Sequence, residues 1–390
     1  MTKSLLSLLA PAVLAGSLFV SPARADEPAL LLVDGHNDLF IRYMDCTSCP
    51  RGLDAYDIRN RTDGDTDIPR LREGGVGAIL LNVFSSDKTT KGTLGAFDFL
   101  RHLELKYRDH FEVAATAADV RRIHGAGRIA LIPTMEGAGR LENDPLMVRT
   151  LQRLGLRAVT LAYQTNDLAD GANATPRHNG LSDLGRAIVA EMNDSGILVD
   201  LSHVSTKVMH DVLDVTKAPV IFSHSSARSL VNVERNVPDD VLKRVAKNGG
   251  IVMVSLVPYF TSQAHADWVK REEALSNQIG QDFEAKRITQ AEGDRLWAEW
   301  HAANPEPEVS VSAVADHIEH IRTIAGIDHV GIGSDFDGMP NKITGLEDTS
   351  KFPNLFAELR RRGWNAEELQ KLAGENFLRV MEDAEKISRK

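Results

Sequence analysis

After its first 25 residues, the chain alternates between short apolar runs and longer amphipathic stretches. The apolar runs are dominated by Val, Ile and Leu without polar alternation, which is typical of strands buried on both faces of a parallel sheet. Strands are predicted at residues 30–34, 77–84, 129–134, 156–162, 197–201, 219–223, 250–256 and 330–333. Eight parallel strands separated by helices predict an α/β fold that closes into a (β/α)8 TIM barrel.

The amphipathic stretches predict the crossover helices. Helices are expected at residues 182–193, 206–215, 239–247, 312–324, 356–362, 366–373 and 375–385. Pro238 is expected at the start of the helix at 239–247, where a missing N–H costs nothing. Gly196 and Gly249 are expected to end helices directly before strands.

One long insertion, at about residues 262–309, interrupts the regular alternation after the seventh strand. It is charged and helical in period, and it contains Trp268, Trp297 and Trp300. A long segment that follows a barrel strand lies on the catalytic face of this fold, so it can form a lid or a wall of the substrate site. A pair of surface helices that only packs or dimerises is the alternative.

The first residues are predicted to be removed rather than folded. Lys3 gives a positive start, residues 5–20 form an apolar run, and Ala23-Arg24-Ala25 is a small-x-small cleavage pattern. These features are typical of a secretory signal peptide at residues 1–25, which leaves a single domain at residues 26–390. An N-terminal anchor is the alternative, but the run is short for a membrane span. We expect export to a periplasm or to the medium, with no membrane span after cleavage.

Composition narrows the class of protein. With 390 residues, 43% of them hydrophobic, the chain can bury a large core, and α/β barrels often use this length as one domain. The formal net charge is −10 and no basic stretch is interleaved with aromatic residues, which argues against a nucleic-acid partner. The only two cysteines, Cys46 and Cys49, are spaced C-x-x-C. In an exported protein this spacing favours a local disulfide over free thiols.

Polar residues with metal-binding side chains follow five of the predicted strands. The carboxyl ends of barrel strands form the face where catalysis occurs in this fold. The candidates are His36 and Asp38 after the first strand, Glu136 after the third, His203 after the fifth, His224 after the sixth and Asp335 after the eighth. Any one of them alone is more typical of a hydrogen-bonded polar residue, but together they gather three imidazoles and three carboxylates at one end of the barrel.

Such a cluster indicates a metal centre. Carboxylates gathered in a semi-buried mouth repel each other unless a cation compensates their charge. Imidazole and carboxylate ligands favour zinc among the common metals, with manganese or cobalt as alternatives. Glu136 can bridge two cations, because each carboxylate oxygen can bind one. The pattern therefore predicts a TIM barrel of the metal-dependent hydrolase type.

The segments around these residues resemble those of the membrane (renal) dipeptidase family of zinc peptidases, as in an exported bacterial-type member. The resemblance extends from about residue 31 to about residue 380. The segments that carry it are Asp34-Gly-His-Asn-Asp-Leu39, Asp200-Leu-Ser-His-Val-Ser205, Pro219-Val-Ile-Phe-Ser-His-Ser-Ser226, Arg235-Asn-Val-Pro-Asp-Asp240, Gly333-Ser-Asp-Phe-Asp-Gly338, Gly345-Leu-Glu-Asp348 and Glu375-Asn376.

The resemblance implies a centre with two Zn2+ ions per chain. One Zn2+ would bind His36, Asp38 and the bridging Glu136. The other would bind Glu136, His203 and His224. The expected activity is hydrolysis of the peptide bond of dipeptides, with D-residues tolerated at the C-terminal position.

The resemblance also implies roles for residues around the metal ions. Arg235 would hold the terminal carboxylate of the substrate, a pairing that its planar guanidinium suits. Asp335 would contact the substrate and handle protons, with Glu136 as the second catalytic carboxylate. Tyr163 stands where the animal enzymes have a histidine that contacts the substrate carbonyl, and a tyrosine can also donate a hydrogen bond there. This departure leaves the side-chain and stereochemical preference open.

Two alternative functions remain. A metal-dependent amidase or lactonase acting on N-acyl amino acids or cyclic esters would use the same centre without needing a free substrate amine. A non-catalytic exported binding protein would account for the barrel but not for the complete set of ligands. The oligomeric state is also open, a homodimer included.

Overall fold

The computed structural model describes residues 30–44, 52–83, 85–87 and 89–388. The predicted signal peptide and both cysteines, Cys46 and Cys49, lie outside these residues. Within the described ranges, no helix is both long enough and apolar enough to cross a membrane.

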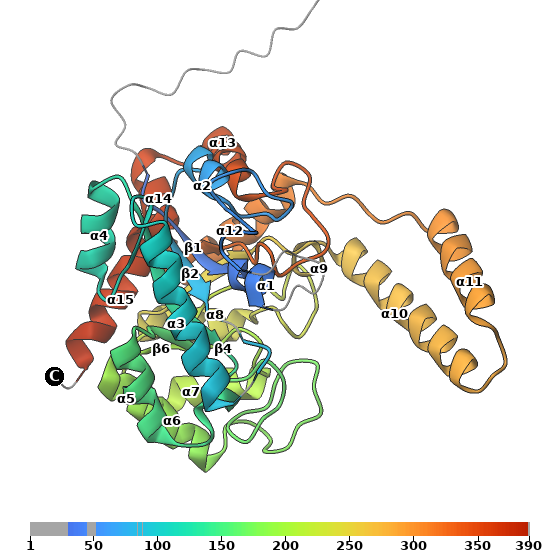
Figure 1. Ribbon diagram of the computed structural model, residues 1–390, viewed down its shortest axis with the longest axis horizontal. Helices are drawn as coiled ribbons and strands as arrows, with labels where there is room; N and C mark the ends of the chain where they lie inside the picture. The colour runs from blue at the N-terminus through green and yellow to red at the C-terminus, as the bar shows by residue number, and fades with distance from the viewer. Residues whose placement is uncertain (1–29, 45–51, 84, 88, 389–390) are drawn as a thin grey trace, which may run out of the picture.

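A closed parallel barrel forms the centre of the molecule (Figure 1). In the part of the chain that the structure describes, its strands are β1 Leu32–Asn37, β2 Val76–Asn82, β4 Ile129–Glu136, β5 Ala158–Thr160, β6 Leu198–Asp200, β7 Ile221–Phe222, β8 Ile251–Ser255 and β9 Val330–Gly333. They pair in the order β2-β1-β9-β8-β7-β6-β5-β4, and β2 also pairs with β4, from Ala78 opposite Ala130 to Asn82 opposite Thr134. This last pairing closes the sheet and confirms the predicted (β/α)8 barrel.

A short extra strand, β3 Phe111–Val113, was not predicted. It pairs with the first residues of β4, with Phe111 opposite Ile129. The neighbouring strand β5 meets β4 only from Thr134 onward, so the early part of β4 has a free edge that β3 covers. Three residues are too few to show a pattern, which is why the sequence did not reveal this strand.

Helices surround the barrel and account for each predicted helical stretch. Their bounds are α1 Leu39–Met44, α2 Ile68–Glu73, α3 Thr90–Lys106, α4 Ala117–Gly125, α5 Pro145–Leu154, α6 Asp183–Ser195, α7 Thr206–Val215, α8 Asp239–Asn248, α9 Pro258–Thr261, α10 Gln263–Glu284, α11 Gln290–Ala303, α12 Val311–Ala325, α13 Phe352–Arg361, α14 Ala366–Gln370 and α15 Asn376–Ile387. Gly196 and Gly249 do end α6 and α8, with φ of 68° and 82°. Pro238 lies at the start of α8 as predicted, where it is the N-cap residue.

The predicted break between the last two helices is absent. A π-helical segment, Lys371–Glu375, joins α14 directly to α15. Gly374 is buried within this segment, and a Cβ atom there would overlap the carbonyl oxygen of Leu31. The glycine therefore allows close contact between the helix and the start of β1 rather than ending a helix.

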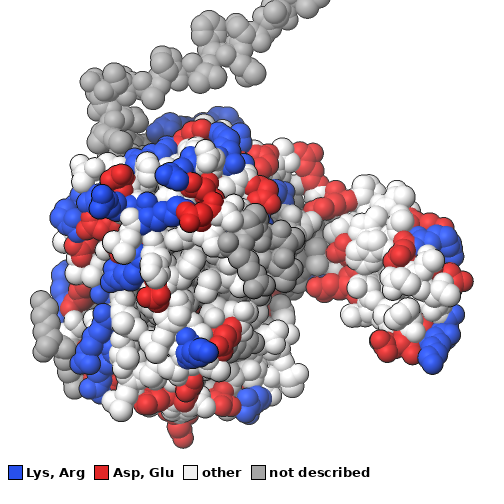
Figure 2. All heavy atoms as spheres, in the orientation of Figure 1, with Lys and Arg blue, Asp and Glu red and all other residues white. Residues whose placement is uncertain are grey.

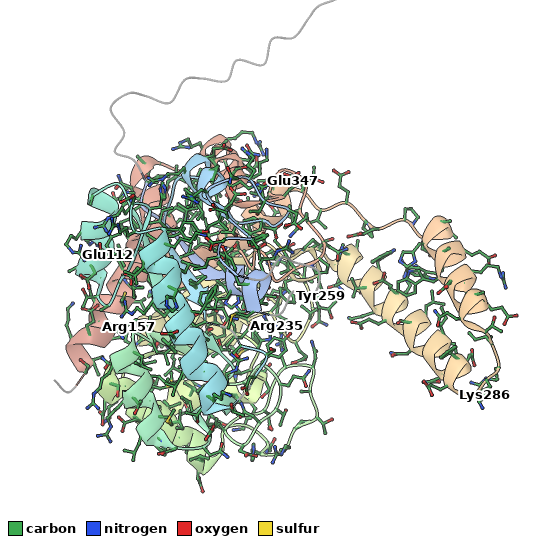
Figure 3. All side chains as sticks on the ribbon, in the orientation of Figure 1. Glu112, Arg157, Arg235, Tyr259, Lys286 and Glu347 are labelled. Atoms are coloured by element: carbon green, nitrogen blue, oxygen red, sulfur yellow. The ribbon has the colours of Figure 1, made fainter. Side chains whose placement is uncertain are left out.

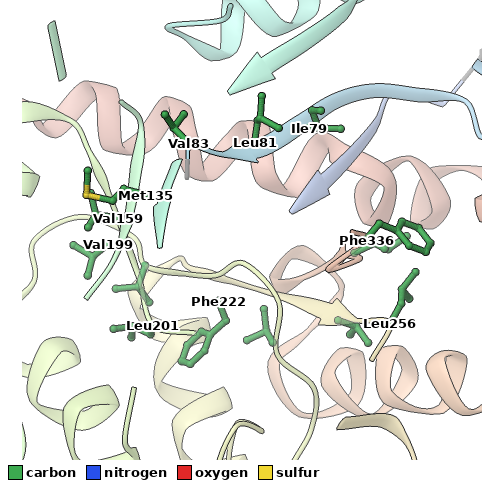
Figure 4. Close-up of a cluster of buried hydrophobic side chains, with 14 of the residues drawn as sticks. Ile79, Leu81, Val83, Met135, Val159, Val199, Leu201, Phe222, Leu256 and Phe336 are labelled. Atoms are coloured by element: carbon green, nitrogen blue, oxygen red, sulfur yellow. The ribbon is translucent and has the colours of Figure 1, made fainter. Parts of the chain in front are cut away.

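Alternate strand residues serve the two faces of the sheet. Ile79 and Leu81 of β2 pack in the apolar layer between strands and helices, part of which is drawn in Figure 4. Ala78 and Leu80 belong to a second cluster, which includes residues of β4, β6 and α15. Asn82 continues this second row at the carboxyl end of β2, so the apolar row ends in a polar side chain at the barrel mouth.

The insertion forms two antiparallel helices, α10 and α11, that project away from the barrel (Figure 1). Trp268 joins them near the base, since its ring lies 5.6 Å from that of Trp300 and its Nε1 donates to the carbonyl oxygen of Asn304 at 2.8 Å. The surface of this arm carries charges of both signs (Figure 2). Figure 3 places Tyr259 at the base of the arm and Lys286 at its far end. In this arrangement the arm does not form a lid.

Candidate metal centre

The barrel brings the six predicted ligands together at its strand ends. His36 lies near the end of β1 and Glu136 is the last residue of β4. The other four, Asp38, His203, His224 and Asp335, follow β1, β6, β7 and β9 by one to three residues.

Glu136 Oε1 is the point on which the three imidazoles converge. Its distances to the Nε2 atoms of His203, His224 and His36 are 2.8, 3.5 and 3.9 Å. The Nε2 atoms of His203 and His224 are 2.9 Å apart, and Asp38 Oδ2 lies 3.4 Å from His36 Nε2. A carboxylate oxygen surrounded by three imidazole nitrogens combines the ligand types of a metal site.

The side chains present fit a cation-binding role. Two triads, His36–Glu136–His224 and His36–Asp38–Asp335, each offer ligand atoms within 4.8 Å of one another. The buried His36 Nε2 has no hydrogen-bond partner among the described residues. A polar atom that is buried without a partner at the centre of a carboxylate cluster indicates a ligand position.

Burial and crowding perturb the acid–base properties of this cluster. Burial raises the pKa of Glu136 and that of Asp335 to about 7 each. Burial lowers the pKa of His203 and of His224 well below the usual range, which leaves both rings neutral, the form that binds a metal. Burial opposes protonation of His36, but the nearby carboxylates, Asp38 first, outweigh it and raise its pKa to about 10. A divalent cation would compensate the same negative charge of the carboxylates that the proton on His36 compensates.

Asn82 is a member of the site that sequence reasoning missed. Its Nδ2 donates to Asp38 Oδ1 at 2.8 Å and to Glu136 Oε2 at 3.4 Å, and its Oδ1 accepts from the Glu136 backbone N–H at 3.3 Å. It therefore fixes the two carboxylates relative to each other. The available signal was a single amide residue at the carboxyl end of an apolar run.

The backbone at the mouth adopts conformations that most residues avoid. His203, Asp335 and Asp337 have φ of 67°, 69° and 66°. Non-glycine residues rarely adopt positive φ, and such strain concentrates at functional sites. A Cβ atom at Gly338 would overlap Asp38 Oδ2, so a side chain at this position would displace the Asp38 carboxylate.

Arg235 and Tyr163 lie beside the cluster. The buried Arg235 reaches only Ser225 Oγ, at a long 3.5 Å from Nη1, and its Nη2 has no hydrogen-bond partner in the described structure. Its guanidinium lies 4.8 Å from the centre of the Phe260 ring. Tyr163 is 54% exposed, and its ring packs 4.6 Å from that of His203. Both residues are therefore placed to meet a molecule bound at the mouth.

The fold and the residues at the barrel mouth together define the class of protein. A TIM barrel whose strand ends carry a cluster of imidazoles and carboxylates is a metal-dependent hydrolase barrel. The model of the membrane dipeptidase family (peptidase family M19) matches residues 25–390. The chain therefore belongs to this family of peptidases, hydrolases that act on peptide bonds, as the sequence motifs predicted.

Known proteins agree with this assignment. The chain is 37% identical to dipeptidase tcpJ of Claviceps purpurea over 374 residues, which cover 91% of this chain and 77% of that protein. Its fold is similar to that of the probable dipeptidase PvdM from Pseudomonas aeruginosa, with a TM-score of 0.78, 24% identity, and coverage of 92% and 96% of the two chains. It is also similar to that of a metallo peptidase from Rhodobacter sphaeroides solved with a phosphinate mimic of the dipeptide L-Ala-D-Ala, with a TM-score of 0.72, 24% identity, and coverage of 92% and 100%.

Proposed function

We propose that this protein is a binuclear zinc dipeptidase. The observation that carries the proposal is the convergence of three imidazole Nε2 atoms on Glu136 Oε1, with Asp38 beside His36. His36, Asp38 and Glu136 would hold one Zn2+, and Glu136, His203 and His224 the other. The chemistry that bound zinc supplies is Lewis acidity, which polarises a carbonyl and makes water a better nucleophile near neutral pH.

The chain's own residues would bind and orient the substrate. Arg235 has an unused Nη2 in a buried position, which suits the terminal carboxylate of a dipeptide. The free amine of the substrate would lie near the acidic ligands at the other end of the site. Holding both ends selects dipeptides. If the amine of a longer peptide lay near the acidic ligands, its terminal carboxylate would lie too far along the chain to meet Arg235.

Asp335 and Tyr163 would act on the scissile bond. The Asp335 carboxylate would accept a proton from the attacking water and donate it to the leaving amide nitrogen. The Tyr163 hydroxyl would donate a hydrogen bond to the oxygen of the scissile carbonyl as negative charge develops there. Dipeptides with a C-terminal D-residue are included among the proposed substrates, and the dipeptide mimic bound by the Rhodobacter sphaeroides relative motivates testing them.

A substrate panel tests this function. The protein is purified with zinc and assayed on L-L and L-D dipeptides, tripeptides, N-acetylated dipeptides and a lactone, with and without a chelator. We expect chelator-sensitive turnover of dipeptides and a large loss of activity when the amine is acetylated or the chain is lengthened. Turnover of N-acyl amino acids or lactones with equal efficiency would favour the amidase or lactonase instead. Zinc-loaded protein that cleaves no dipeptide would refute the proposal.

We also propose that the protein is exported. The support is the charged start, apolar run and Ala23-Arg24-Ala25 pattern of the first 25 residues. N-terminal sequencing of protein expressed in its own host should find a start near Asp26, and a retained Met1 would contradict export by this route.

A further inference from the structure

A chain of hydrogen bonds leads from a buried aspartate to one of the candidate metal ligands. We propose that Asp200 and Ser223 are positioning residues that hold the His224 ring in the tautomer whose Nε2 is free to bind a cation. Both residues would act on the metal centre of the proposed function, on which their role rests, without touching a metal ion themselves.

Asp200 is fully engaged as a hydrogen-bond acceptor. Its Oδ1 accepts from the backbone N–H groups of Ser202 at 3.0 Å and Ser223 at 2.9 Å. Its Oδ2 accepts from the hydroxyls of Thr160 at 2.6 Å and Ser223 at 2.7 Å. All of these groups are buried, and they come from β5, β6 and the end of β7. Four donors on two oxygens fix both the position of this carboxylate and its role as an acceptor.

The direction of the Ser223 proton follows from these contacts. A serine hydroxyl has one proton, and at 2.7 Å from a carboxylate oxygen it must donate that proton to the oxygen. Ser223 Oγ then has only lone pairs to offer to His224 Nδ1, which lies 2.8 Å away. This contact is a hydrogen bond only if Nδ1 carries the ring proton.

The consequence lies on the other side of the ring. A neutral imidazole has one proton, so a protonated Nδ1 leaves a lone pair on Nε2. That atom faces Glu136 Oε1 at 3.5 Å and His203 Nε2 at 2.9 Å. The backbone N–H of His224 also donates to Ser202 Oγ at 3.0 Å, which fixes the position of the residue. The three polar residues thus present a ligand atom to the centre before any cation arrives.

Asp200→Asn gives a sharp test, because the structure dictates how the amide must sit. Oδ1 accepts two backbone N–H groups, so the amide oxygen takes its place and the amide nitrogen replaces Oδ2. That nitrogen would donate to Ser223 Oγ, which would turn its own proton toward His224 Nδ1. The ring proton would then move to Nε2, the atom required for metal binding.

The variants to compare are Asp200→Asn, Ser223→Ala and, as a matched control, Thr160→Val. The control removes a different hydroxyl from the same carboxylate and leaves Ser223 in place. Nitrogen NMR of 15N-histidine-labelled, metal-free protein reports the tautomer, and His224→Gln assigns the signals. Chelator competition then gives the zinc affinity.

We expect wild type and Thr160→Val to show a protonated Nδ1, Ser223→Ala to show a mixture of tautomers, and Asp200→Asn to show a protonated Nε2. Loss of a residue that orients a metal ligand typically weakens metal binding 10–100-fold. Zinc affinity should therefore fall by about that factor in Asp200→Asn and Ser223→Ala, the two relay variants. Circular dichroism shows whether each variant folds, and either relay variant alone suffices for the test. A wild-type ring protonated at Nε2, or an unchanged tautomer in a folded relay variant, would overturn the inference. The tautomer is read without substrate, so failure of the dipeptidase function would be a separate result.

Discussion

Replacing Arg235 by Met tests how the substrate is held. Wild-type Arg235 is buried, with an unpaired Nη2 and one weak contact from Nη1, so two of its N–H groups can meet a carboxylate. A hydrogen bond to a charged group contributes about 1.5–3 kcal/mol. Two of them at the low end of that range amount to about 3 kcal/mol, and since 1.4 kcal/mol is tenfold, we expect kcat/KM for a dipeptide to fall roughly 10²-fold.

The assay compares each dipeptide with its C-terminal amide. The amide lacks the negative charge that Arg235 would bind, so Arg235→Met should lower kcat/KM for the acid far more than for the amide. Equal losses on the two substrates would refute the assignment, since Arg235 would then act on the fold or on the metal centre. Arg228→Met is the matched control, because the Arg228 guanidinium already donates to the carbonyls of Asn236 and Glu234 and to Thr206. That variant should lose stability but keep the acid-to-amide ratio.

Arg235→Met should lower activity without lowering the stability of the unliganded protein. A buried guanidinium with an unpaired nitrogen destabilises the unliganded fold. Arg235→Met keeps an apolar stem against Phe260 and removes the charge, so the unliganded variant should unfold at an equal or higher urea concentration than wild type. A clearly lower unfolding midpoint would mean that the guanidinium stabilises the loop.

Three further predictions follow from other parts of the structure. Asn82→Leu should weaken zinc binding about 10–100-fold in chelator competition, because Asn82 holds two candidate ligands, and unchanged affinity would contradict that role. Adding zinc at 100 times its Kd to metal-free protein should stabilise the fold by about 2.7 kcal/mol, seen as a higher Tm, whereas no shift would argue against a preformed site. Burial lowers the pKa of His317 to about 4, so the unfolded chain binds a proton between pH 6.5 and 4 that the folded chain does not. The free energy of unfolding should therefore fall as the pH drops through this window, by up to about 3 kcal/mol more in wild type than in His317→Asn. Urea unfolding at pH 7.5 and at pH 4.5 measures this loss for both proteins. An equal loss in wild type and in the variant would contradict the prediction.

The fold was predictable wherever a pattern repeats over enough residues. Eight apolar runs predicted eight barrel strands because strands buried on both faces need uninterrupted apolar sequence. The failures have local causes. Strand β3 forms because β4 has a free edge there, which is a property of the assembled sheet. The predicted helices at 366–373 and 375–385 leave out position 374, but the role of Gly374 is set by the carbonyl of Leu31, more than 340 positions earlier in the chain.

The candidate site was also predictable only in part. The gathering of the candidate ligands was predictable because the fold brings every strand end to one mouth, so residue type and position in the chain are sufficient for it. What could not be predicted is which atom of each ligand faces the centre. That choice is made by residues of neighbouring strands, as Asn82 does for Asp38 and Glu136, and as Asp200 does for His224 through Ser223. A serine directly before a histidine is unremarkable in sequence. It becomes informative only when the barrel places an aspartate from the adjacent strand 2.7 Å from its hydroxyl. The orientation of the candidate metal ligands is therefore a property of strand neighbours, and variants of those neighbours should change metal affinity while leaving the candidate ligands themselves intact.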